Sequence, residues 1–336
     1  MTATRERRSA RAPSAPPRPL GSERNPGMSL DFEFLRRVRV NRSAVERRAA
    51  TLPARRTVKK DWQAAWLLRA ITCLDLTTLQ GDDTAGNVGR LCAKARHPVR
   101  EDLLQALGAE SLGIRVAAVC VYHALVPTAV AELEGSGIAV AAVSAGFPAG
   151  LNPMPQRLEE IRASVAAGAD EIDVVITRAH ALTGAWEALY DEVRAFRDAC
   201  GPAHLKVILG TGELATLTTV ARASLVAMMA GADFIKTSTG KESVNATLPV
   251  GLVMARMIRE YQDATGVAVG FKPAGGIRTA RAALDWLMLM KEELGNGWLS
   301  HTRFRIGASS VLTDIERQLE HFVTGRYSAA YRHPMV

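Results

Sequence analysis

One segment, Gly231-Ala-Asp-Phe-Ile-Lys236, aligns without a gap with an earlier one, Gly168-Ala-Asp-Glu-Ile-Asp173. In each copy a glycine ends a helical pattern, a short turn follows, and an apolar strand begins. The same succession recurs along most of the chain, since short β-rich runs alternate with segments of helical periodicity. This alternation is typical of parallel strands joined by helices.

Eight β-rich runs follow one another over about 250 residues, which is the size of a (β/α)8 barrel. We expect strands at 71–76, 116–122, 139–144, 171–176, 205–209, 234–236, 267–272 and 304–307. A doubly wound sheet is the alternative, but it calls for a Gly-x-Gly-x-x-Gly pattern after the first strand, and the sequence has none there. The predicted fold is therefore an α/β TIM barrel.

Helix signals support this division of the chain. Helical patterns at 157–167 and 218–230 each end before a glycine, and a third at 280–294 follows Thr279, a good N-cap. Two amphipathic helices, at 30–48 and 60–69, precede the first strand. We expect four parts: a disordered basic leader (1–28), a helical extension packed on the barrel (29–69), the barrel (70–322) and a C-terminal tail (323–336).

The net charge of +8 suggests a nucleic-acid partner, but its distribution argues against one. Residues 1–60 hold 16 Lys/Arg and 5 Asp/Glu, a net +11, whereas the remainder holds 26 and 29, a net −3. The Pro-, Ser- and Arg-rich stretch at 4–26 is typical of a solvated tail. A weak contact with a polyanion through this leader is the alternative.

The bulk composition points to a cytoplasmic enzyme without a metal or cofactor. No apolar run reaches the roughly 20 residues of a membrane helix, and we find no secretory signal. The four cysteines form no Cys-x-x-Cys pair, which favours a reducing compartment. The seven histidines show no metal-binding spacing.

Two lysines carry the predicted chemistry, because Lys236 and Lys272 end neighbouring apolar strands. Two buried ammonium groups repel, so that one loses its proton more easily and can attack a carbonyl carbon. The aligned segments place Asp173 in the same register as Lys236, on an alternate strand of the barrel. Lys206 on the strand between them adds a third amine. A strand-end lysine that reaches solvent is the alternative for each.

Glycine-rich loops follow the last two strands and predict a phosphate site. The loops are Gly275-Gly-Ile-Arg278 and Gly307-Ala-Ser-Ser310, and Gly240-Lys241 follows the sixth strand. The candidate phosphate ligands are Gly240, Lys241, Gly275, Gly276, Arg278, Gly307, Ser309 and Ser310. Ordinary turns, and a surface position for Lys241, are the alternatives.

Further candidates for substrate binding lie at other strand ends. Asp75 and Thr77 could bind substrate hydroxyls or cap the following helix, and spacing does not separate these roles. Cys120 is counted with them, although an apolar strand is also where a small core residue is expected.

Five motifs together resemble deoxyribose-phosphate aldolase. They are Phe234-Ile-Lys-Thr-Ser-Thr-Gly-Lys241, Gly270-Phe-Lys-Pro-Ala-Gly-Gly276, Glu171-Ile-Asp-Val-Val175, Asp75-Leu-Thr-Thr-Leu79 and Gly307-Ala-Ser-Ser310. The likeness runs from about Met28 to Tyr331. Arg55-Arg-Thr-Val-Lys-Lys60 and Trp62-Gln-Ala-Ala-Trp66 resemble the longer, animal-type branch.

The resemblance implies a metal-free class I aldolase that reversibly cleaves 2-deoxy-D-ribose 5-phosphate to D-glyceraldehyde 3-phosphate and acetaldehyde, in deoxynucleoside breakdown. It implies a Schiff base on Lys236, assistance from Lys272 and Asp173, and substrate contacts from Asp75, Thr77 and Lys206. It also implies a C-terminal tyrosine that visits the site, either Tyr327 or Tyr331. The partners would be small phosphorylated sugars and aldehydes, with a homodimer as the candidate assembly.

Some residues depart from the family pattern. His123 and Leu125 stand where relatives commonly have Pro and Arg, Gly210 replaces a bacterial Glu, and Ser144 replaces a Thr. None of these is a predicted catalytic group. Two other functions stay open: a phosphosugar lyase or isomerase that uses Asp173 as base, and a scaffold that binds RNA or protein through residues 1–60.

Overall fold

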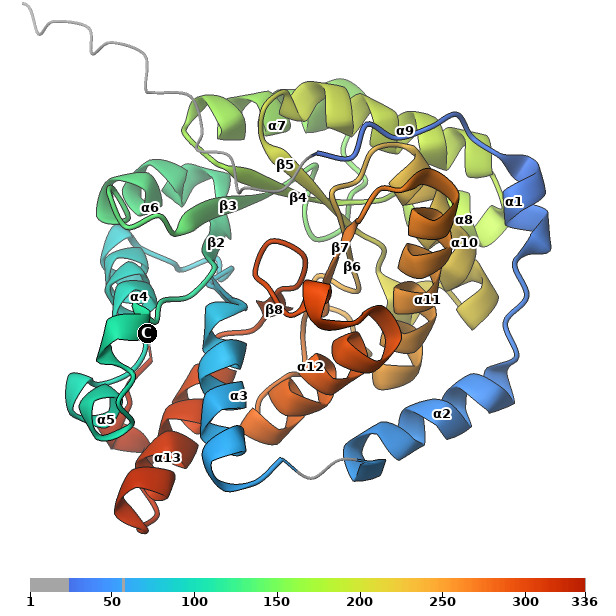
Figure 1. The fold of residues 1–336 in the computed structure, drawn as a ribbon. Coiled ribbons are helices and arrows are strands. Elements are labelled where there is room, and N and C mark those ends of the chain that lie inside the picture. Colours follow the sequence, from blue (N-terminus) through green and yellow to red (C-terminus); the bar gives the residue numbers. More distant parts are fainter. Residues whose placement is uncertain (1–23, 56–57, 336) are drawn as a thin grey trace, which may run out of the picture.

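Eight parallel strands form a closed barrel in the computed structural model, which describes residues 24–55 and 58–335 (Figure 1). The strands are β1 (Leu74–Thr77), β2 (Ala118–Tyr122), β3 (Ala139–Ser144), β4 (Glu171–Val175), β5 (His204–Ile208), β6 (Phe234–Lys236), β7 (Gly270–Lys272) and β8 (Ile306–Gly307). Their order is β7-β6-β5-β4-β3-β2-β1-β8. Two parallel bridges, Phe271 to Phe304 and Ala274 to Gly307, join the two ends. The predicted (β/α)8 fold is confirmed.

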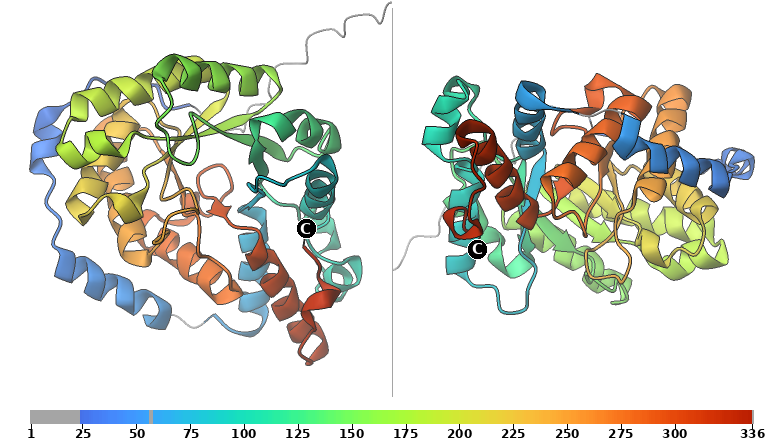
Figure 2. Two further views of the ribbon diagram at one scale, coloured as in Figure 1. Left: turned by 180° about the vertical axis from the view of Figure 1, so that it is seen from behind. Right: turned by 90° about the horizontal axis from the view of Figure 1, so that it is seen from below.

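Helices surround the strands on the outside, as the two further views show (Figure 2). They are α1 (Phe32–Arg37), α2 (Arg42–Arg55), α3 (Lys60–Thr72), α4 (Ala85–Arg96), α5 (Glu101–Ala106), α6 (Val126–Glu132), α7 (Met154–Ala166), α8 (Arg178–Thr183), α9 (Trp186–Cys200), α10 (Leu217–Met229), α11 (Leu248–Thr265), α12 (Ala280–Leu294) and α13 (Ser310–Thr324). Threonine N-caps begin several of them: Thr279 Oγ1, for example, accepts a hydrogen bond from Ala282 N at 3.2 Å.

Several boundaries differ from those expected, most of them by one to three residues, and two of the differences have a clear local cause. Helix α3 continues through Thr72, so that the first strand begins at Leu74 rather than at residue 71, because Ile71 belongs to the buried face of the helix. The helix expected at 30–48 is two helices, since Asn41 Oδ1 accepts a hydrogen bond from Ala44 N at 3.0 Å and begins α2 anew.

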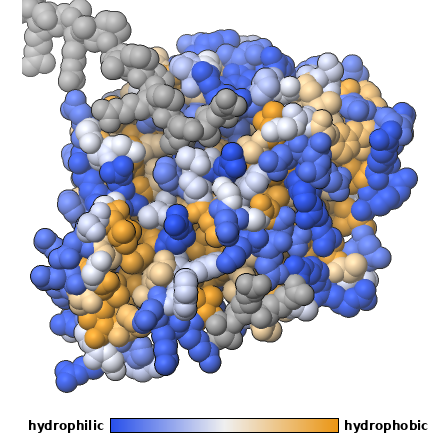
Figure 3. Space-filling model, in the orientation of Figure 1, coloured by the Kyte–Doolittle hydropathy of each residue, from blue (hydrophilic) through white to orange (hydrophobic). Residues whose placement is uncertain are grey.

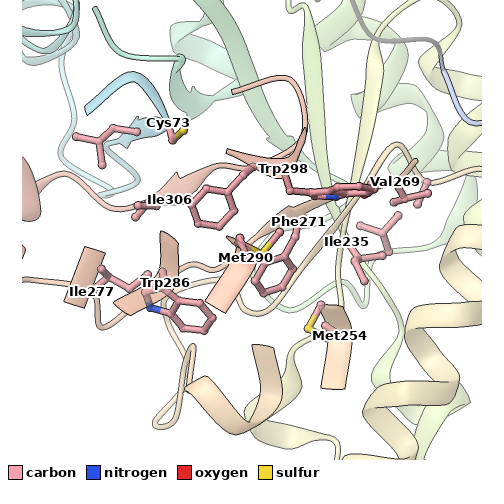
Figure 4. Close-up of a cluster of buried hydrophobic side chains, with 14 of the residues drawn as sticks. Cys73, Ile235, Met254, Val269, Phe271, Ile277, Trp286, Met290, Trp298 and Ile306 are labelled. Carbon is pink, nitrogen blue, oxygen red and sulfur yellow. The ribbon is translucent and has the colours of Figure 1, made fainter. Parts of the chain in front are cut away.

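The apolar core has two layers, because successive strand residues point to opposite faces of the sheet. The outer layer lies between strands and helices, where Phe271 packs against Trp286 at a centroid distance of 5.9 Å, with Met290 nearby (Figure 4). The inner layer lies inside the barrel: Leu79, Cys120, Ala141, Val143, Phe147, Val175 and Ile208. The sequence therefore places every second strand residue in the lumen.

The N-terminal part is attached to the barrel at several points. Helix α2 packs on α11 and α12, where Arg48 forms ion pairs with Glu292 at 2.7 Å and Glu293 at 3.2 Å. The predicted leader extended to residue 28, yet its last residues contact the barrel: Asn25 is buried, and Met28 N donates to Met229 O at 2.7 Å. Residues 1–23 lie outside the described part of the chain.

The surface mixes polar and apolar residues on the face drawn in Figure 3. Among the described residues, no helix has the length and apolar character needed to cross a bilayer.

Candidate active site

The predicted catalytic side chains meet inside the barrel. Asp173 pairs in register with Lys206 of the next strand, and Lys236 pairs with Lys272 in the same way. All four side chains are buried. They share the inner face of the sheet because strand residues two apart, or directly paired in a parallel ladder, point the same way.

Asp173 is the centre of this group. Its Oδ2 accepts hydrogen bonds from Lys236 Nζ and from Lys272 Nζ, both at 2.8 Å. Its Oδ1 accepts one from Lys206 Nζ at 2.7 Å. Burial by itself raises the pKa of Asp173, but the three ammonium groups outweigh it and hold that pKa well below its ordinary value. Asp173 is therefore a carboxylate that positions three amines around one point.

A second set of charges lies next to the first. Lys272 Nζ donates to Asp75 Oδ2 at 2.5 Å, and Lys206 forms an ion pair with Glu171. Arg305, which is fully buried, donates to Glu171 Oε1 at 2.6 Å. Burial raises the pKa of Glu171, but Arg305 and Lys206 outweigh it and lower that pKa to about 2. Among the described residues, the network thus joins seven ionisable side chains through direct contacts.

The charges in this network do not balance. Three carboxylates (Asp75, Glu171, Asp173) face four cationic groups (Lys206, Lys236, Lys272, Arg305). An unpaired charge in the interior is costly, so that loss of one proton relieves the excess.

The three lysines differ in their contacts with the carboxylates. Lys206 and Lys272 each contact two carboxylates, whereas Lys236 contacts a single oxygen that it shares with Lys272. For both Lys206 and Lys272, burial lowers the pKa, but the neighbouring carboxylates outweigh burial and raise it above the ordinary value. Among the described residues, Lys236 therefore has fewer carboxylate contacts than Lys206 or Lys272.

Other predicted substrate-binding residues line the same lumen. Asp75 Oδ1 is buried and, within residues 24–55 and 58–335, has no hydrogen-bond partner, so that it is available as an acceptor. Thr77 Oγ1 donates to Asp75 O at 3.1 Å. Cys120 belongs to the inner apolar layer, and burial raises the pKa of its thiol to about 12. The thiol is thus a neutral part of the wall.

The predicted phosphate ligands lie on the loops after β6, β7 and β8. Gly240, Gly275 and Gly276 all have φ between 80° and 86°, which favours glycine. A β-carbon on Gly240 would lie 3.9 Å from Gly275 Cα, so that these two loops are neighbours. Lys241 and Arg278 are exposed, and Lys241 Nζ lies 3.5 Å from Gln80 Oε1.

The residues after β8 have specific contacts with the lumen. The Ser309 hydroxyl donates to Thr77 O at 2.8 Å and accepts from Thr77 N at 2.7 Å, so that its one hydrogen is used within the protein. Ser310 is exposed and begins α13. A β-carbon on Gly307 would lie 3.1 Å from Lys272 Cε, so that glycine leaves room here for the Lys272 side chain.

Sequence reasoning missed Glu171 and Arg305. The signal for Glu171 was present, because it lies two residues before Asp173 on the same strand and must face the same side. Arg305 lies two residues before Gly307 in the predicted eighth strand and so points to the same face. The sequence does not reveal, however, that a carboxylate inside the barrel compensates its charge.

The C-terminal tyrosines lie at the surface. Tyr327 is 87% exposed and Tyr331 is 84% exposed. The tail that carries them is held on α13, where Glu320 accepts hydrogen bonds from Ser328 Oγ at 2.5 Å and Arg332 Nη1 at 2.6 Å, and its Oε2 lies 2.6 Å from His333 Nε2.

Comparison with known proteins identifies the family of the chain. Residues 69–310 match the family model described as DeoC/LacD family aldolase. A human protein named deoxyribose-phosphate aldolase is 61% identical over 316 residues, which cover 94% of this chain and 99% of that protein.

Two solved structures share the fold. One, of a putative deoxyribose-phosphate aldolase from Coccidioides immitis, has a TM-score of 0.60 and 24% identity, and covers 81% of this chain and 97% of its own. The other, a tetrameric deoxyribose phosphate aldolase from Aeropyrum pernix, has a TM-score of 0.58 and 23% identity, and covers 79% and 97%. With a family model that matches most of its length and a relative this similar, the chain belongs to the DeoC/LacD family of aldolases.

Proposed function

We propose that the protein is a deoxyribose-phosphate aldolase, which cleaves 2-deoxy-D-ribose 5-phosphate reversibly to D-glyceraldehyde 3-phosphate and acetaldehyde. The observation that carries this proposal is the cluster in which Lys236 and Lys272 share one oxygen of Asp173. It supplies a buried amine that can be neutral beside an ammonium group that can donate protons.

The reaction begins with a Schiff base. The neutral amine of Lys236 attacks C1 of the open-chain sugar, and the carbinolamine loses water to give an iminium ion. Lys272 and Asp173 transfer the protons that this loss requires. They are placed for it because Lys272 Nζ and Lys236 Nζ are both hydrogen-bonded to Asp173 Oδ2.

Carbon–carbon cleavage follows. The C3 hydroxyl loses its proton, the C2–C3 bond breaks, and its electron pair moves into the iminium to form an enamine. Glyceraldehyde 3-phosphate leaves with C3 as its aldehyde carbon. Protonation of the enamine and hydrolysis release acetaldehyde and restore the Lys236 amine.

The remaining site residues have proposed binding roles. Asp75, Thr77, Cys120 and Lys206 contact the sugar, and the free Asp75 Oδ1 is placed to accept from a hydroxyl. The backbone of the loops at Gly240, Gly275 and Gly276, and the start of α13 at Ser309 and Ser310, surround the phosphate. Lys241 and Arg278 supply positive charge at the rim, and Gly307 accommodates Lys272.

The alternative in which Asp173 acts by itself as the base of an isomerase has less support. As the only base of an isomerase, Asp173 would have to keep the proton it removes, which it binds weakly because its pKa is well below the ordinary range. In the aldolase it only relays protons between neighbouring groups.

We further propose a cytoplasmic location and a basic leader over 1–28, followed by a helical extension (29–69), a barrel (70–322) and a tail (323–336). All four cysteines are unpaired and buried, which suits a reducing compartment.

A homodimer is the proposed assembly. Leu112 and Phe322 line a groove between α3, α5 and α13, and they are 63% and 41% exposed. Sedimentation velocity would show a dimer, or refute it by showing a monomer.

Reductive trapping tests the reaction. With 2-deoxyribose 5-phosphate and borohydride, we expect a covalent adduct on Lys236, located by mass spectrometry of peptides. Lys236→Ala should lose activity by on the order of 10⁴-fold or more, because the nucleophile is removed.

Lys59→Ala is the matched control, since this exposed lysine precedes α3, has no proposed role in the site and should leave the adduct in place. An adduct on a different lysine, or full activity in Lys236→Ala, would refute the mechanism.

A further inference from the structure

Glu242 bonds to the backbone of the loop that is proposed to hold the substrate phosphate. Thr239 N donates to both carboxylate oxygens of Glu242, at 3.0 Å each, and Gly240 N donates to Glu242 Oε2 at 3.2 Å. The carboxylate thus accepts from two consecutive N–H groups directly after β6. Such a pair of N–H groups forms an anion-binding concavity.

The loop is shaped to present these N–H groups. Gly240 has φ 86°, and Lys241 N donates to Thr239 Oγ1 at 3.1 Å, which tightens the turn. Asn245 Nδ2 donates to the carbonyl of Glu242 at 2.9 Å and so holds the backbone of that residue. The glutamate is therefore fixed at its backbone, while its side chain is only partly buried.

The same loop touches the second glycine-rich loop. A β-carbon on Gly275 would lie 2.7 Å from Asn245 Oδ1, and one on Gly240 would lie 3.9 Å from Gly275 Cα. An anion that contacts both loops must come close to the N–H groups of Thr239 and Gly240. A phosphate and the Glu242 carboxylate cannot accept from these donors together, because both are negatively charged and need the same space.

We propose that Glu242 is an internal anion that competes with the substrate phosphate for the N–H groups of Thr239 and Gly240. The inference rests on the proposed function only in that the ligand is a phosphate monoester. The phosphate gains the two N–H groups by displacing the carboxylate. Because the phosphate must first displace the carboxylate, its observed affinity is lower than it would be for the open loop. Glu242 therefore sets how strongly the protein distinguishes phosphorylated from unphosphorylated sugars.

Two variants test the charge of Glu242 separately from its hydrogen bonds to the loop. Glu242→Gln keeps an oxygen that can accept from the N–H groups but removes the charge, and Glu242→Ala removes both. Inorganic phosphate, titrated into the full-length protein in a calorimeter, should bind roughly three- to tenfold more tightly to each variant, since a larger fraction of the loop is open to it. The ratio of KM for 2-deoxyribose 5-phosphate to KM for 2-deoxyribose should fall by a similar factor.

Asp82→Asn is the matched control. Asp82 is exposed and lies two residues from Gln80, whose side chain neighbours Lys241. This variant removes the same charge from the adjacent loop and should change phosphate affinity by less than about twofold, because the charge is screened by solvent.

The proposal is overturned if both Glu242 variants bind phosphate as weakly as the wild type, or more weakly, or if Asp82→Asn tightens binding equally. A wild-type protein that binds phosphate but does not cleave the sugar would refute the proposed function instead, and the calorimetric comparison would still decide the role of Glu242.

Discussion

The Glu171–Arg305 ion pair shows how single residues next to the proposed site contribute to its charge and to stability. Neither side chain was predicted, and both are buried in the lumen next to Lys206. Removal of one partner from a buried pair leaves a charge without compensation, which is more costly than the pair itself is stabilising. The pair therefore matters for stability as well as for the charge around the lysines.

Glu171→Gln should lower the free energy of unfolding at pH 7 by about 3–5 kcal/mol. Because the pKa of Glu171 is lowered from 4.5 to about 2 on folding, its ion pairs stabilise the protein above pH 4.5, and this contribution is lost as the pH falls toward 2. Urea denaturation across this range should show a shallower pH dependence in the variant than in the wild type.

Glu134→Gln, at an exposed position, is the control and should keep the wild-type slope. An unchanged slope in Glu171→Gln would contradict the assigned ion pairs.

At the scale of elements, the site depends on where strands and helices stop. Lys236 and Lys272 each end a strand of three residues, so that the following loops begin directly after the two lysines proposed to be catalytic. The side chain of Thr279 caps α12, whose predicted bounds agree with the structure, whereas Thr247 before α11 makes no side-chain cap. Local capping thus sets the end of the loop between β7 and α12.

Thr279→Ala should lower the free energy of unfolding by about 1 kcal/mol, because Ala282 N loses its capping partner. Thr279→Ser retains a hydroxyl and is expected to keep most of this stability. Denaturant titration of the two variants measures the difference, and equal stability of the Ala and Ser variants would show that the cap contributes nothing.

At the scale of the whole molecule, segments far apart in sequence close the structure. The bridges from Phe271 to Phe304 and from Ala274 to Gly307 complete the barrel, and residues 24–28 pack against the end of α10. Asn25 Nδ2 donates to Met228 O at 2.7 Å and to Ala232 O at 2.9 Å, and Tyr261 Oη donates to Asn25 Oδ1 at 3.1 Å. This one side chain joins the N-terminal segment to three parts of the barrel.

Asn25→Ala should release the N-terminal segment, because it leaves several buried polar groups without partners and costs roughly 2–4 kcal/mol. Hydrogen exchange at Met28 N, which donates to Met229 O, should become faster, while the strands keep their protection. Asn41→Ala, which removes a cap outside this contact, is the control. Unchanged exchange at Met28 in Asn25→Ala would refute the anchoring role.

The sequence by itself determined the fold class, the eight strands and the residues at their ends. It could do so because apolar periodicity, helix caps and glycine stops are local properties of the chain. It also placed Asp173 and Lys236 in the same register, which follows from an ungapped internal repeat, and Lys272 at the matching end of the next strand.

Only the tertiary structure decided how the charges combine. Arg305 is about 130 residues from Glu171 in sequence, and their 2.6 Å contact exists only after the barrel closes. The excess of one cation, and the choice of Lys236 as the amine with the fewest carboxylate contacts, depend on distances across the lumen. The bonds from Thr239 and Gly240 to Glu242 likewise depend on how the loop folds back. Electrostatic energies depend on the distance between charges in space, and this distance cannot be read from their separation in the sequence.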